Sequence, residues 1–112
     1  MEIKISEVFT KTPGARFKTD GDFSGEEFRQ SFLLPSFEQA EQRNEKLTID
    51  LDDGYGYATS FLEESFGGLA RIHGTEKVLK TLAFISQDEP SLIAQIEQYI
   101  QNSNNKKTVG AS

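Results

Sequence analysis

Two adjacent hydroxyls are the residues of this chain whose position is best suited to chemistry. Thr59 and Ser60 follow the segment LDDGYGYA (51–58) and open a predicted helix. Hydroxyls at a helix N-terminus create a surface at which a phosphate or a partner can be recognised. The same side chains could instead cap the helix, since Ser60 and Glu63 have the spacing of a capping box. The residues alone leave both interpretations open.

A cluster of carboxylates precedes the hydroxyls. Asp50, Asp52 and Asp53 stand where a predicted strand ends. An enzyme could use Asp50 or Asp52 to hold Mg²⁺ or to accept a phosphoryl group. The spacing does not fit a calcium-binding loop, because Gly54 comes one position early. We therefore expect a solvated loop, and a chain that has no catalytic residue, cofactor or metal ion.

The residues around the hydroxyls form the predicted partner-binding surface. Tyrosine is favoured at protein interfaces. Two glycines inside a helix indicate a close approach to its backbone, because each costs about 1 kcal/mol relative to alanine. Packing within the domain is the simpler explanation for both features. The predicted partner-binding residues are Tyr55, Tyr57, Thr59, Ser60, Phe61, Glu64, Gly67 and Gly68.

Length and composition limit the classes of function. A chain of 112 residues forms one domain, for which we expect residues 1–101, followed by a disordered polar tail at 102–112. The net charge of −6 argues against nucleic acid as a partner. The absence of cysteine excludes disulfides, and no apolar run approaches the roughly 20 residues of a membrane span. We expect a cytoplasmic protein.

Elements that would position these residues can be placed from the hydropathy pattern. Ser24 with Glu27 forms a capping box at the start of one helix, and Asp88 can cap the last helix. Pro35 predicts a kink or a break between two helical pieces near Leu34. Strands alternating with helices predict an α/β fold, with a mostly parallel or mixed four-stranded sheet covered by three or four helices. The predicted strands are 3–8, 15–22, 47–51 and 78–85, and the predicted helices are 24–40, 60–74 and 88–101.

Four stretches of the chain resemble a known family. They are TKTPGARF (10–17), FSGEEFR (23–29), LLP (33–35) and DLDDGYGYATSFLEESFGGL (50–69). Their combination is similar to the STAS-like domains of unknown function, over about residues 8 to 75. More distantly, the chain resembles the STAS domains of bacterial anti-sigma factor antagonists, which place an Asp-Ser-Ser group after the central strand. Ala58, Thr59 and Ser60 fall on that group.

The resemblance implies a regulatory function. In the antagonists, an ATP-binding anti-sigma kinase binds the unmodified domain and phosphorylates the middle hydroxyl of the group. By this likeness Thr59 would be the phosphoacceptor, Ser60 its neighbour, and the partner a kinase-like ATP-binding regulator in a bacterial or phage system. The chain departs from the pattern at Ala58, where the antagonists have Asp, and in having Thr as the acceptor. The alternative function is a small-molecule or nucleotide sensor that uses the pocket between the strand ends and the helix start.

Overall fold

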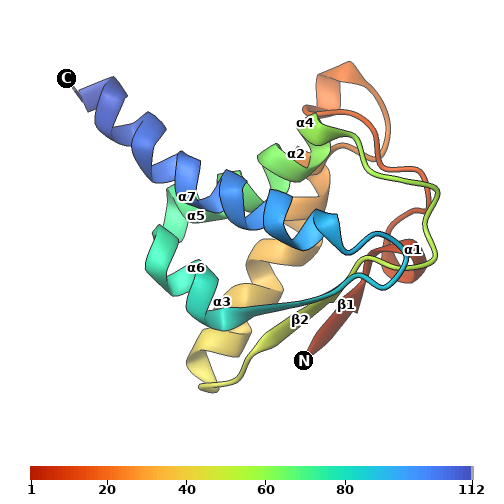
Figure 1. Cartoon of the computed structure of the whole chain (residues 1–112), viewed down its shortest axis with the longest axis horizontal. Coiled ribbons are helices and arrows are strands. Elements are labelled where there is room, and N and C mark those ends of the chain that lie inside the picture. The colour runs from red at the N-terminus through yellow and green to blue at the C-terminus, as the bar shows by residue number, and fades with distance from the viewer. Residues whose placement is uncertain (112) are drawn as a thin grey trace.

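The sheet of this protein has three parallel strands. The computed structural model describes residues 1–111 and the side chains of residues 1–103. Strands β1 (Glu2–Lys4), β2 (Leu47–Asp50) and β3 (Leu82–Ile85) pair in the order β1-β2-β3, with β2 in the middle (Figure 1). Ile3 pairs with Ile49, which pairs in turn with Phe84. The strand predicted at 47–51 is confirmed, and the predicted fourth strand is not found in residues 1–111.

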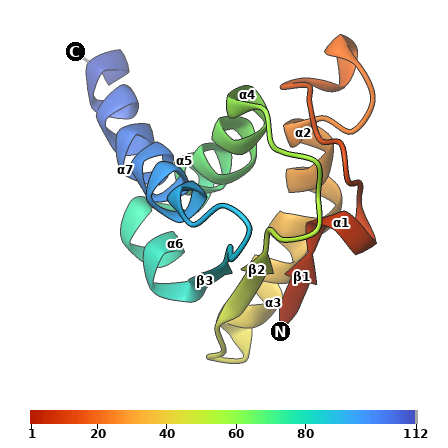
Figure 2. The same ribbon diagram turned by 45° about the vertical axis from the view of Figure 1, so that its right-hand side comes forward.

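Helical segments cover one face of the sheet, the one from which Leu47 and Ile49 point into the core (Figure 2). Residues 25–42 form one continuous helical run, and residues 59–73 form another. Each run contains a five-residue π-helical segment, named η2 in the first and η3 in the second. The helical elements are α1 (Ile5–Val8), η1 (Lys18–Asp20), α2 (Gly25–Phe28), η2 (Arg29–Leu33), α3 (Leu34–Gln42), α4 (Thr59–Leu62), η3 (Glu63–Gly67), α5 (Gly68–His73), α6 (Thr75–Thr81) and α7 (Ser91–Ala111).

Phenylalanine rings fill the space between the two helical runs. Phe28 in α2 and Phe61 in α4 are fully buried, with ring centroids 5.7 Å apart. Phe9 packs against both, and Phe66 continues the contact toward β3 by an edge-on contact with Phe84. Aromatic rings at these separations add about 0.5–1.5 kcal/mol per pair beyond the area they bury. This aromatic core fixes α4 against α2.

The first helical run begins where the sequence predicted. Ser24 is its N-cap, and its hydroxyl accepts a hydrogen bond from the Glu27 backbone N–H at 3.0 Å. Near Leu34, where a kink or a break between two helical pieces was expected, the run does not end, but one helical type gives way to another. The run passes through the π-helical segment η2 and continues as α3, with Pro35 in the first positions of that helix. Proline has no backbone N–H to donate, and Pro35 lies where the π-helical pattern of hydrogen bonds gives way to the α-helical one.

Three predicted strands were wrong in whole or in part. The strand predicted at 3–8 ends at Lys4, because Ile5–Val8 form the helix α1 and the Ile5 carbonyl accepts from the backbone N–H groups of Phe9 and Thr10 instead of from a neighbouring strand. Residues 15–22 contain the short helix η1, and the backbone N–H groups of Gly25 and Glu26 donate to the carbonyls of Ala15 and Arg16. This segment therefore packs against the start of α2 instead of joining the sheet. The run 78–85 divides in two. Its first half completes α6, where Val78 is buried, and only Leu82–Ile85 forms β3.

The C-terminal helix α7 begins at Ser91 rather than at Asp88. The Asp88 carboxylate instead accepts a hydrogen bond from the Asp53 backbone N–H at 2.9 Å. The disordered tail at 102–112 stays a prediction, because most of it lies outside the residues whose side chains are described. Among the described residues, no helix is both long and apolar enough to span a membrane.

Candidate functional site

Two carboxylates at the end of β2, Asp50 and Asp52, accept hydrogen bonds from backbone N–H groups. Asp50 accepts a hydrogen bond from the backbone N–H of Asp52, which closes a turn. One Asp52 oxygen accepts from the backbone N–H groups of both Gln87 and Asp88, at 2.8 and 2.9 Å. Asp52 thereby ties the loop after β2 to the loop after β3. No group of three or more metal-ligating side chains suited to a metal ion is found among the described residues.

Asp53 connects the same loop to the end of β1. Its side chain accepts a 2.6 Å hydrogen bond from the Lys4 ammonium at the end of β1. This bond lowers the pKa of the Asp53 carboxyl below its ordinary value and raises that of Lys4. Asp53 has a φ of 68°, in the left-handed region that a short polar side chain tolerates. The acidic loop is therefore a turn held by hydrogen bonds.

The two tyrosines of the loop differ in exposure. The Tyr57 ring packs against Phe61, and its hydroxyl donates a 3.0 Å hydrogen bond to the Leu51 carbonyl. Burial raises the pKa of Tyr57, and the nearby carboxylates of Asp50 and Asp52 raise it further. Tyr55, in contrast, is 80% exposed. The strand-end pocket between these tyrosines and the start of α7 holds only about 160 Å³, below the roughly 300 Å³ where small-molecule sites begin.

Thr59 and Ser60 open the second helical run without capping it. The N-cap is Ala58, which has no side chain able to cap. Neither hydroxyl makes a hydrogen bond with a residue whose side chain is described. The capping box predicted for Ser60 and Glu63 is wrong, because the Glu63 carboxylate turns to arginines instead. Thr59 is exposed and Ser60 is half-buried.

About one helical turn after the hydroxyls, Glu63 and Glu64 bind three arginines. We call these five side chains the Arg–Glu cluster. Arg16 Nη1 lies 2.6 Å from Glu63 Oε1 and 3.3 Å from Glu64 Oε1. Arg29 Nη1 lies 2.6 Å from Glu64 Oε2 and also donates to the Glu64 carbonyl. Arg71 holds Glu63 with both of its terminal nitrogens, at 2.8 and 3.4 Å. Both glutamates are buried. The cluster joins η2, η3, α5 and the segment before α2.

Glycines make room for this cluster. A side chain at Gly68 would meet the Arg29 guanidinium, and one at Gly67 would meet the Glu63 carboxylate. At Gly25 a Cβ atom would lie 2.6 Å from the Phe61 carbonyl oxygen. The close approach predicted for Gly67 and Gly68 therefore occurs within the domain, where arginine side chains pass over the helix backbone.

The predicted partner-binding residues thus divide by exposure. Tyr55 and Thr59 are exposed, and Tyr57 and Ser60 are partly so. The other members, Phe61, Glu64, Gly67 and Gly68, are buried and support the surface from beneath. Their role in binding a partner stays a prediction.

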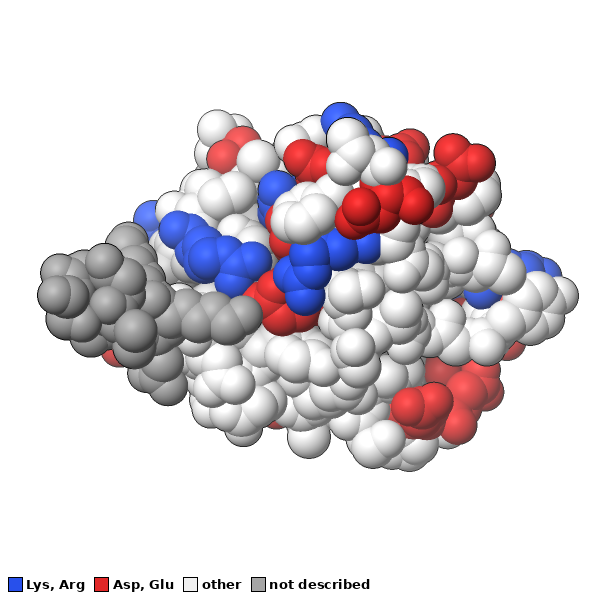
Figure 3. Space-filling model, turned by 90° about the horizontal axis from the view of Figure 1, so that it is seen from above, with Lys and Arg blue, Asp and Glu red and all other residues white. Residues whose placement is uncertain are grey.

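The sequence reasoning missed the three arginines. They are far apart along the chain, and no periodic pattern connects them. Two features of the sequence pointed to them: the adjacent carboxylates Glu63 and Glu64, and the Gly67-Gly68 pair. On the face that carries α2 and α4, basic side chains border acidic ones (Figure 3).

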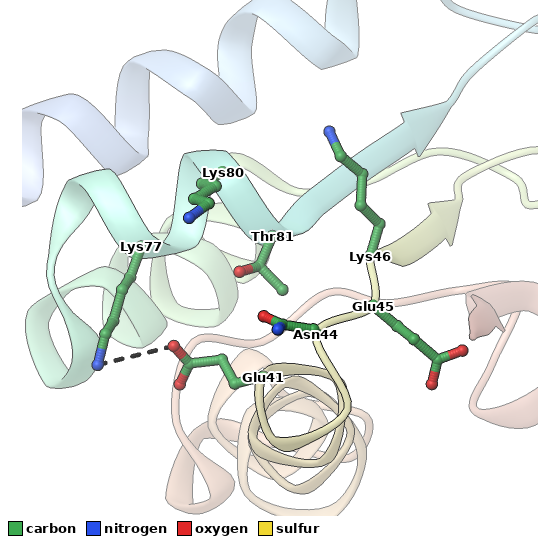
Figure 4. A pocket seen from close by; sticks show the side chains of 7 residues that line it. All are labelled: Glu41, Asn44, Glu45, Lys46, Lys77, Lys80 and Thr81. Carbon is green, nitrogen blue, oxygen red and sulfur yellow. Dashed lines mark ion pairs between the residues drawn. The ribbon is translucent and has the colours of Figure 1, made fainter.

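A larger hollow of about 440 Å³ lies at the other end of the sheet (Figure 4). Its residues precede β2 and β3, whereas ligands of open parallel sheets bind beyond the carboxyl ends of the strands. Lys77 points to Glu41 at 3.6 Å, and Lys80 lies in the last turn of α6, where a cation offsets the helix dipole. These lysines have a structural explanation. The lining residues are Glu41, Asn44, Glu45, Lys46, Lys77, Lys80 and Thr81.

Comparison with known proteins matches more than half of the chain to one family. The family model described as "STAS-like domain of unknown function (DUF4325)" matches residues 24–92. The match includes β2, the acidic loop, both hydroxyls and the four members of the Arg–Glu cluster that follow residue 24. The searches of curated proteins and of solved structures found no match.

Proposed function

Because the chain belongs to the family of STAS-like domains of unknown function, we propose that it is a non-catalytic interaction module for a protein partner. The partner is a kinase-like, ATP-binding regulator in the cytoplasm, and the contact surface lies around Tyr55 and Thr59. Thr59 is the position at which phosphorylation releases the partner. This proposal extends the resemblance to the antagonists from the fold to the mode of regulation.

The observation that carries the proposal is the unused hydroxyl of Thr59. It is exposed, it opens the helical run 59–73, and it has no hydrogen-bond partner among the described residues. Its removal or modification therefore breaks no hydrogen bond among the described residues. A phosphate adds about −1.5 to −2 charge. The helix N-terminus stabilises that charge by about 0.3–1 kcal/mol, so the fold is expected to survive.

In a packed interface the same charge is unfavourable, because a buried and unpaired charge is costly. Every 1.4 kcal/mol of lost interaction weakens binding about tenfold. A modification that the free domain tolerates can thus release a bound partner. The exposed ring of Tyr55, close along the chain to Thr59, supplies the apolar contact area that such an interface requires.

The test compares Thr59→Glu with wild type in a pull-down from the lysate of the source organism, with bound proteins identified by mass spectrometry. Ser91→Glu is the matched control, since Ser91 is exposed and opens α7. We expect wild type and Ser91→Glu to retain an ATP-binding protein, and Thr59→Glu to bind it about tenfold less tightly or worse. Equal retention by Thr59→Glu, or no ATP-binding protein with any form, would contradict the proposal. Thermal unfolding checks that all three forms are folded.

A further inference from the structure

The strand-end pocket lies at the carboxyl ends of β2 and β3, where ligands of open parallel sheets bind. Its walls come from the loop that follows each strand and from the start of α7. The volume of about 160 Å³ equals that of about five water molecules in the liquid. A free metabolite needs more room than this, whereas a single long side chain of another protein does not. The size of the pocket therefore favours one inserted side chain.

Hydrogen bonds between the two loops hold the pocket in shape. The Asp52 carboxylate accepts from the backbone N–H groups of Gln87 and Asp88. In the opposite direction, the Asp88 carboxylate accepts from the backbone N–H of Asp53. The loops are thus joined by three hydrogen bonds. A pocket with walls fixed in this way loses little conformational entropy when it binds a ligand.

The pocket combines apolar surface with an aromatic ring that is open to solvent. Leu51 and Leu92 line it and are 3% and 5% exposed, so they offer apolar contact from a fixed position. The half-buried ring of Tyr57 adds to this surface. Tyr55 also lines the pocket, and its ring is 80% exposed. The face of an exposed aromatic ring attracts a cation.

The charge of the pocket is negative. Asp88 and Glu89 line it, and no Lys, Arg or His does so among the described residues. Neither carboxylate forms an ion pair with a described residue, and one Asp88 oxygen has no described hydrogen-bond partner. A ligand that complements these walls carries an apolar stem that ends in a positive charge.

We propose that the strand-end pocket receives a lysine side chain of the protein partner. The four-carbon stem of lysine packs on Leu51 and Leu92, and its ammonium group lies between the carboxylates and the Tyr55 ring. Lysine suits the small volume better than arginine, which has a larger, planar head group. The proposal rests on the interaction module proposed above, and it adds the chemistry by which the partner is recognised.

The first test needs no partner. The full chain is titrated at pH 7 with the peptide acetyl-Gly-Lys-Gly-amide, and binding is followed by ¹⁵N–¹H NMR. The control peptide has norleucine in place of lysine, which keeps the stem and removes the charge. We expect the lysine peptide to shift the amide resonances of residues 54–57 and 86–89, and to bind about tenfold more tightly than the norleucine peptide.

Two pairs of variants examine the walls. Glu89→Gln should weaken binding of the lysine peptide by about two- to fivefold. Glu97→Gln, at an exposed glutamate further along α7, should leave binding unchanged. Tyr55→Ala should weaken binding by a similar factor, about two- to fivefold, whereas Tyr55→Phe keeps the aromatic face and should bind like wild type. All four substitutions are at exposed residues, and thermal unfolding verifies that the variants are folded.

Equal binding of the lysine and norleucine peptides, or no loss of affinity in Glu89→Gln, would overturn the proposal. Tighter binding of an arginine peptide would overturn the choice of lysine. The second test adds Glu89→Gln and Glu97→Gln to the pull-down described above. Retention of the ATP-binding protein should fall only in Glu89→Gln, and equal retention would show that the partner does not use the pocket. Peptide binding without any ATP-binding protein in the pull-down would reject the proposed function and leave the lysine-binding pocket standing.

Discussion

At the scale of single residues, Tyr57 links the acidic loop to the core. Its hydroxyl satisfies the Leu51 carbonyl at the end of β2, and its ring covers Phe61. The pKa of Tyr57 is raised chiefly by burial and secondarily by Asp50 and Asp52. The folded protein therefore keeps the Tyr57 proton at pH values where the unfolded chain has released it.

The raised pKa of Tyr57 predicts that the stability of the folded protein depends on pH. A group with a raised folded-state pKa contributes stability that is complete below its unfolded pKa, about 10 for tyrosine, and is lost as the pH rises above it. We expect Tyr57→Phe to lower the free energy of unfolding by about 1 kcal/mol at pH 7, through loss of one hydrogen bond. The difference from wild type should narrow above pH 10. Urea unfolding at pH 7 and pH 10.5 measures both, and Tyr55→Phe, at an exposed ring, serves as the control.

A constant difference between wild type and Tyr57→Phe across this pH range would contradict the assignment. Titration of tyrosine absorbance offers an independent measurement. In the wild-type protein, one tyrosine should ionise only at higher pH than the others, and Tyr57→Phe should remove that late component.

At the scale of elements, the contact between α2 and α4 requires a glycine, Gly25, which has no side chain. Gly25 is the first residue of α2, where local helix propensity alone would favour alanine. In the folded protein a Cβ atom there would lie 2.6 Å from the Phe61 carbonyl oxygen and close to Glu64 and Ser65. Because the nearest atom belongs to a backbone, the two helical runs would have to separate.

We therefore expect Gly25→Ala to destabilise the protein by about 1–3 kcal/mol, the usual effect of overpacking. Gly14→Ala is the matched control, since a Cβ atom at Gly14 meets no atom within 4 Å. Chemical denaturation of the two variants and wild type measures the difference. Should Gly25→Ala prove as stable as Gly14→Ala, the approach of the two runs must be looser than described.

At the scale of the whole molecule, the Arg–Glu cluster connects segments that are distant in the sequence. The Arg29 and Glu64 side chains are 13% and 11% exposed, so water screens their interaction weakly. Replacing one member of such a pair leaves the other charge buried and unpaired, which is more harmful than the pair itself is stabilising. The cluster therefore specifies how the two helical runs and the segment before α2 pack together.

Glu64→Gln should lower the free energy of unfolding by about 2–4 kcal/mol, because it leaves the Arg29 guanidinium without a carboxylate. Glu38→Gln is the control. Glu38 pairs with His73 at 3.0 Å, but its side chain is 51% exposed, and surface pairs contribute about 0–1 kcal/mol. Thermal or urea unfolding of both variants at pH 7 gives the comparison. Equal effects of the two substitutions would show that the cluster does not hold the fold together.

Much of the fold was predictable wherever a local signal existed. Alternation over Leu47, Ile49 and Leu51 predicted β2, and Ser24 predicted the start of α2. Predictions from local patterns failed where the same pattern of apolar residues suits both a strand and a helix. The apolar residues of 78–85 suit a strand or a helix, and the turn between α6 and β3 depends on which side chains the core accepts. Residues 15–22 have a weak alternation that their contacts with α2 override.

The sequence by itself determined the α/β class, the family, and the location of the hydroxyls at the start of a helix, because periodicity, turns and motifs are properties of neighbouring residues. Only the tertiary structure decided that Ala58 is the N-cap and that both hydroxyls are unused. It also decided that Glu63 and Glu64 form ion pairs with arginines from three segments of the chain. Arg16 and Glu63 are 47 residues apart, and their pairing depends on the path of the whole chain between them. A contact of that range leaves no periodic trace in the sequence.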